Sequence, residues 1–241
     1  MTVRAPIAGA IVALAVTVAM EARAQTQNDS GEIHGLKLGL LAQTMTLNGW
    51  GELACGSNGG PTRQELGTWS EFGKCPPDAS GLHEVAARFD DEDEYVGKAL
   101  GNPLYAGPRI GTRVAGHPVV LSALFDDGGT LRGIRIVSDP RATLAERRMA
   151  HLFGIAVISR YGTDGWTCTD FAPAEDESPV GGVFINRRCE KRMPERDIAI
   201  EVHLLRKPGQ HEVDPETHEH TRGEFESWTR FELFDPNLHK Q

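Results

Sequence analysis

The sequence predicts an α+β fold in which a mostly antiparallel β-sheet is packed by one main helix and braced by two disulfides. Residues 117–138 contain two apolar, β-branched strands on either side of an Asp-Asp-Gly-Gly turn. Residues 198–204 and 225–233 alternate apolar and polar side chains, as half-buried strands do. Between these two regions, apolar residues spaced four apart indicate a helix.

The first 24 residues have the pattern of a cleaved signal peptide. Arg4 precedes an apolar run from Ala5 to Met20, and Ala22-Arg23-Ala24 supplies small residues at the cleavage site. That run is shorter than the ~20 residues a membrane-spanning helix needs. We therefore expect a Sec-type signal peptide over 1–24, a periplasmic or secreted mature protein without an integral membrane span, and a flexible tether over 25–32.

The chain is acidic, with a formal net charge of −9. Nucleic acid and anionic lipid both require a concentrated positive surface, so neither is expected as the main partner. The remaining length can bury one core, which predicts a single α+β domain over 33–236. Phe-Asp-Asp occurs at 89–91 and again at 125–127, which suggests a weak duplication with halves of about 33–115 and 116–236.

Four cysteines remain after signal cleavage, and an even count in an exported protein predicts disulfides. Of the three pairings, Cys55–Cys75 with Cys168–Cys189 is favoured, because it closes two loops of nearly equal length that both contain glycine. A four-thiolate zinc site is the alternative, but no Cys-x-x-Cys pair occurs.

In the first half of the chain, the sequence predicts a strand that leads into Cys55, a disulfide-closed loop, and a strand over 82–89. After the 117–138 hairpin, Asp139 is the expected N-cap of the main helix, with Pro140 at its first position. The helix is expected over 140–153, with an end near Tyr161 as the alternative. The residues at i+4 spacing along its predicted length are Leu144, Arg148, Leu152 and Ala156, with the apolar Ala145 and Met149 beside them.

The last two strands allow the register to be predicted. If Asp214-Pro215-Glu216-Thr217 forms the turn, Ile200 opposes Phe231 on the buried face. On the other face, Glu201 then meets Arg230 as a charge pair, and His203 meets Trp228. We expect these four side chains to form an interaction surface.

These features favour a non-catalytic binding protein that recognises another protein of the cell envelope or acts like an inhibitor, without a cofactor. The acidic chain suggests a partner with a basic surface. Two α+β units with one disulfide each are similar in layout to the β-lactamase inhibitor protein family. That similarity concerns architecture alone, and no motif in this sequence matches the family, so it assigns no role to any residue. No Gly-x-Ser-x-Gly motif occurs, and the oligomeric state is left open.

The alternative function is a metal-binding protein or metal-dependent enzyme that uses the His-rich hairpin 203–220. His211 would oppose His220, and His218 would lie one pleat away on the same side. Imidazole groups bind zinc or copper. Against this, His218-Glu219-His220 lacks the spacing of the His-Glu-x-x-His motif.

Overall fold

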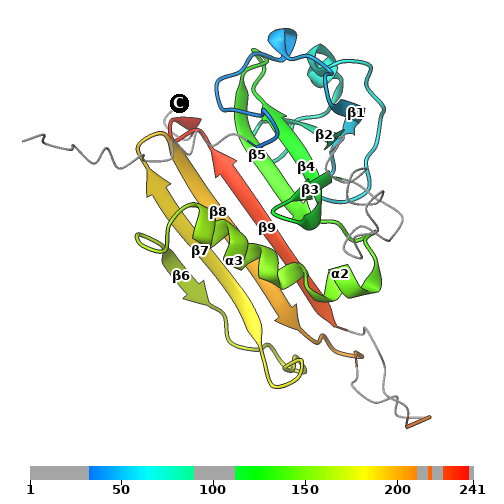
Figure 1. The fold of residues 1–241 in the computed structure, drawn as a ribbon, viewed down its shortest axis with the longest axis vertical. Coiled ribbons are helices and arrows are strands. Elements are labelled where there is room, and N and C mark those ends of the chain that lie inside the picture. The colour runs from blue at the N-terminus through cyan, green and yellow to red at the C-terminus, as the bar shows by residue number, and fades with distance from the viewer. Residues whose placement is uncertain (1–32, 90–111, 211–216, 219–224, 239–241) are drawn as a thin grey trace, which may run out of the picture.

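The computed structural model describes residues 33–89, 112–210, 217–218 and 225–238 (Figure 1). The predicted signal peptide and tether therefore lie outside the described residues. Within the described part, the fold is a mostly antiparallel β-sheet with few helices and two disulfides. The sheet contains strands from both halves of the suggested duplication, which stays a prediction.

The described residues contain nine strands in one sheet: eight follow the order β1-β2-β4-β5-β9-β8-β7-β6, and β3 pairs with β4. Every pairing is antiparallel. Two meanders, β1 to β5 and β6 to β9, join where β5 pairs with β9 (Figure 1). The strands are β1 Trp50–Cys55, β2 His83–Phe89, β3 Thr112–Val114, β4 His117–Phe125, β5 Leu131–Ser138, β6 Thr167–Asp170, β7 Ile185–Met193, β8 Arg196–Leu205 and β9 Glu226–Phe234.

Both predicted hairpins are present. β4 and β5 pair on either side of a turn in which Gly129 donates its N–H to the carbonyl of Asp126. In the last hairpin, Ile200 lies opposite Phe231, which confirms the predicted register. Both side chains are buried, and a shift of one residue would turn this apolar row toward water. The residues of the predicted turn before Thr217 lie outside the described residues.

The helical segment starts later than predicted. Its first helix, α2, spans Leu144–Arg148, and its N-cap is Thr143 rather than Asp139. Thr143 and Glu146 form a capping box in which each side chain accepts the backbone N–H of the other residue. Asp139 instead accepts the N–H of Arg141 in a turn before the helix.

The helical segment is also broken, which corrects the prediction of one continuous helix over 140–153. A short 3₁₀ helix at Ala150–Leu152 separates α2 from α3, which spans Phe153–Arg160. The tighter 3₁₀ turn changes which side chains face the sheet. Leu144 of α2 is exposed, whereas Phe153 and Val157 of α3 are buried.

One face of the sheet is covered along its length. α3 crosses β8 and β9 (Figure 1), and a Cβ at Gly154 would lie 2.6 Å from Val202 of β8, so only glycine fits this close approach. Near the other end, the 3₁₀ helix Trp69–Lys74 places Phe72 5.4 Å from Phe125 of β4, ring centre to ring centre. We call this the covered face.

The two disulfides have the favoured pairing. Cys55–Cys75 links β1 to the end of the Trp69–Lys74 helix, and Cys168–Cys189 links β6 to β7. They close loops of 20 and 21 residues. Each meander of the sheet therefore contains one covalent link.

Candidate functional site

No described helix lies on the other face of β7, β8 and β9. The strand register places alternate side chains of the three strands on this side, and antiparallel sheets commonly leave one such face to water. We call this surface the open face. Its side chains include those of Asn186, Arg188, Glu190, Arg192, Ala199, Glu201, His203, Trp228, Arg230 and Glu232.

The structure brings together the four residues predicted as an interaction surface. His203 lies opposite Trp228, and their rings stack with centres 4.0 Å apart and an angle of 14° between the planes. The Nε2 atom of His203 lies 3.2 Å from a carboxylate oxygen of Glu201. Both rings are partly exposed, so the stacked pair is a preformed aromatic surface.

The predicted charge pair between Glu201 and Arg230 is replaced by other contacts, although these residues lie directly opposite each other. Arg230 donates to Glu232 at 2.7 Å and to the side chain of Asn58, which belongs to the loop after β1. Glu201 contacts His203 instead. The long-range contact with Asn58 draws the guanidinium away from Glu201.

A buried ionic cluster lies beside the open face, at the middle of the sheet. Arg135 of β5 donates to Glu84 of β2 at 2.8 Å, to Glu232 of β9 at 2.7 Å and to Asp78 at 3.0 Å. Arg135 and Glu84 are almost fully buried. Three carboxylates around one guanidinium satisfy its donors in a fixed geometry.

The cluster shifts the pKa values of its carboxyl groups. Burial raises the pKa of Glu232, but hydrogen bonds from Arg230 and Arg135 outweigh it, so this pKa lies below its ordinary value. Burial also raises the pKa of Asp78, and hydrogen bonds from Ser80 and Arg135 lower it overall. Both carboxyl groups are therefore ionised at neutral pH.

The loop at residues 56–65 covers this cluster. The N–H of Asn58 donates to Glu84 at 2.8 Å. Gly59 has a φ of +85°, and a Cβ there would lie 2.6 Å from a methyl group of Val137, so the loop packs directly on β5. The loop is thus fixed to the same side of the sheet as the open face.

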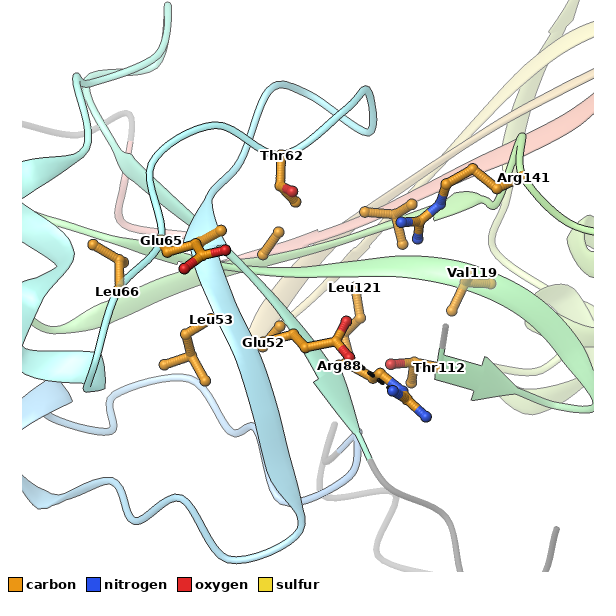
Figure 2. Close-up of a pocket in the computed structure, with 14 residues that line it drawn as sticks. Glu52, Leu53, Thr62, Glu65, Leu66, Arg88, Thr112, Val119, Leu121 and Arg141 are labelled. Carbon is orange, nitrogen blue, oxygen red and sulfur yellow. Dashed lines mark hydrogen bonds and ion pairs between the residues drawn. The ribbon is translucent and has the colours of Figure 1, made fainter. Parts of the chain in front are cut away.

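Next to this loop is a pocket of about 550 Å³, shown in Figure 2. Small side chains of β1, β2 and β4 form its floor, namely those of Ala54, Ala86 and Val120. In the close-up, Glu65 of the loop and Arg141 lie on opposite sides of the pocket. The volume falls within the range of pockets that hold small ligands or partner side chains.

The charged groups of the pocket are largely paired. Arg88 donates to Glu52 at 2.8 Å across its lower side in Figure 2. Arg141 makes two hydrogen bonds to Asp139, at 2.9 and 2.8 Å. The pocket therefore combines a small apolar floor with a polar rim, an arrangement suited to an extended side chain with a polar end.

The metal hypothesis gains no support from the described residues. His211 and His220 lie outside them, and His218 lies in a described stretch of two residues with a φ of 57°. Among the described histidine, cysteine, aspartate and glutamate residues, no group of three is arranged to hold a metal ion.

The ionic cluster and the pocket were missed by sequence analysis. Arg135 gave a weak signal, because it lies between Ile134 and Ile136 in a mostly apolar strand. Its three partners come from β2, β9 and the turn before β2, and no local pattern links them.

Comparison with protein-family models, with curated proteins and with solved structures gives no match for this chain. None of the helices in the described ranges has the length and apolar character needed to cross a membrane.

Proposed function

We propose that this chain is an exported, non-catalytic binding protein that recognises another protein of the cell envelope, in the manner of an inhibitor, through its open face. The observation that carries the proposal is the stacked pair of His203 and Trp228 among charged side chains on a face without a described helix. Tryptophan and arginine are the residues that most often dominate binding energy at protein interfaces.

The rigidity of this surface supports the proposal. The side chains project from three paired strands, and His203 is held between the Trp228 ring and the Glu201 carboxylate. A surface that is ordered before binding loses less conformational entropy when a partner docks.

The pocket extends the proposed surface. Ala86, on the pocket floor, lies two residues after Glu84 in β2, so both side chains point to the same side of the sheet. The pocket therefore opens on the side of the sheet where the open face lies. A partner that lies across the open face can insert a side chain there. The net charge of −9 would steer a basic partner toward the chain.

Export is supported by the apolar N-terminal segment and by the two disulfides, which suit an oxidising compartment. A binding role in the envelope is compatible with both features.

The Trp228→Ala variant tests this function in affinity capture from an envelope extract. If Trp228 is an interface anchor, its truncation should weaken capture of the partner by about 2 kcal/mol, or roughly 30-fold in affinity. Ile155→Ala is the matched control, because Ile155 is 65% exposed on the helix over the covered face. Equal capture by the Trp228→Ala variant and the wild type would contradict the proposal.

A further inference from the structure

We infer that the outer edge of β6 accepts an extended, basic segment of a partner protein as an additional strand of the sheet. This inference concerns a different surface from the open face and does not rest on the proposed function. Addition of a strand to an exposed edge is a common mode of peptide recognition, in which the backbone supplies the hydrogen bonds.

The two ends of the sheet differ. At the β1 end, the returning loop covers the edge. Cys55 donates its N–H to the carbonyl of Gln64 at 2.7 Å, and Leu66 donates to the carbonyl of Leu53 at 2.8 Å. At the other end, β6 pairs with β7 alone among the described strands (Figure 1). An uncovered edge presents unpaired backbone groups that can template another strand.

The pairing of β6 with β7 identifies those groups. Cys168 lies opposite Cys189 with only 4.0 Å between their Cα atoms, which is the short spacing of a pair without mutual hydrogen bonds. Three residues on, Phe171 donates its N–H inward to Asn186 at 2.8 Å. With this alternation, the N–H and C=O groups of Cys168 and Asp170 point away from β7.

β6 is held in place before any partner arrives. The Cys168–Cys189 disulfide fixes it to β7, and Arg187 of β7 makes two hydrogen bonds to the carboxylate of Asp170, at 2.5 and 2.9 Å. All four residues of β6 are exposed. The edge is thus a short, rigid template, which limits its self-association and lowers the entropy cost of adding a strand.

The surroundings of the edge indicate the partner's chemistry. Phe171 is 47% exposed at the end of β6, and Val183 before β7 is 49% exposed, so an apolar side chain can pack there. Exposed carboxylates flank the strand, at Asp164 before it and at Glu175 and Asp176 in the loop after it. A segment with alternating apolar residues and lysine or arginine side chains complements both features.

A synthetic peptide, Lys-Val-Arg-Val-Lys with blocked termini, is the probe. It should bind the wild-type chain about tenfold more tightly than the acidic peptide Glu-Val-Glu-Val-Glu, because the flanking carboxylates repel the latter. A basic peptide methylated on all backbone nitrogens should also lose about tenfold in affinity, because it keeps the charge but cannot donate backbone hydrogen bonds. Titration followed by NMR measures all three affinities.

Two variants at one position locate the binding edge. Asp170→Pro removes an outward N–H without removing a bond to β7, so the fold should be kept while binding falls about tenfold. Asp170→Ala keeps the N–H and controls for the lost carboxylate. Hydrogen exchange should show the amides of Cys168 and Asp170 unprotected in the free chain and protected with peptide.

Three results would each overturn the inference: equal binding of the methylated peptide, full affinity in Asp170→Pro, or no saturable binding of the basic peptide. Protection of the Cys168 and Asp170 amides in the free chain would overturn it too, because the edge would already be covered. None of these results bears on the capture experiment with Trp228→Ala, so the two proposals fail separately.

Discussion

Replacing Arg135 by alanine is expected to lower the free energy of unfolding by about 3–5 kcal/mol, the usual cost of breaking a buried ion pair. The variant leaves the carboxylates of Glu84, Glu232 and Asp78 without their shared cation. The control is Arg188→Ala, because Arg188 pairs with Glu190 on the solvated open face and should contribute no more than about 1 kcal/mol. Urea denaturation of both variants measures the difference.

The effect of Arg135→Ala should depend on pH. In the wild type, burial raises the pKa values of Glu232 and Asp78, but hydrogen bonds lower them by more. Both pKa values therefore lie below their ordinary values. These groups stabilise the fold above the carboxyl pKa of the unfolded chain, and this contribution is lost as the pH falls through their folded pKa values. Without Arg135, each carboxyl group loses one of the hydrogen bonds that lower its pKa, so the folded variant loses less stability than the wild type when these groups are protonated. The stability gap should stay constant from pH 7 to about pH 4.5 and narrow at lower pH, and a gap that stays constant below about pH 4.5 would contradict this explanation.

Removing the Cys55–Cys75 disulfide by a double alanine substitution should cost about 3 kcal/mol, as expected for a closed loop of 20 residues. The same change at Cys168 and Cys189 is the matched control, because its loop of 21 residues predicts a similar loss. Only the first variant should also release the loop at 56–65 and so open the pocket. Urea denaturation measures the two losses.

Hydrogen exchange separates the two disulfide variants. Loss of protection in the pocket loop is expected for the Cys55–Cys75 variant alone, because this disulfide joins β1 to the segment that follows the loop. A stability loss below about 1 kcal/mol, or equal loop protection in both variants, would show that packing rather than the covalent link holds the loop.

The sequence predicted those parts of the fold that depend on local pattern. The register of β8 with β9 followed from strict alternation and a proline turn, and the disulfide pairing followed from loop length. The helix start was wrong, although its true signal was present. Thr143 and Glu146 have the spacing of a capping box, whereas Asp139 with Pro140 only resembles a cap.

The site was predictable where it depends on register alone. Alternation placed His203 beside Trp228, and the structure stacks them. The contacts of Arg230 could not be foreseen, because Asn58 lies 172 residues away in the sequence. The pocket and the Arg135 cluster likewise require loop 56–65 and strands that are distant in sequence, and composition does not reveal such contacts.

Site-specific photo-crosslinking tests the proposed binding surface most directly. A photoreactive residue is placed at Arg188, whose side chain is 48% exposed on the open face, or at Ile155 on the helix over the covered face. After irradiation in envelope extract, we expect a discrete protein adduct from position 188 and none from position 155. An adduct from position 155 with none from position 188 would contradict the account, because the partner would then bind the helical side of the sheet.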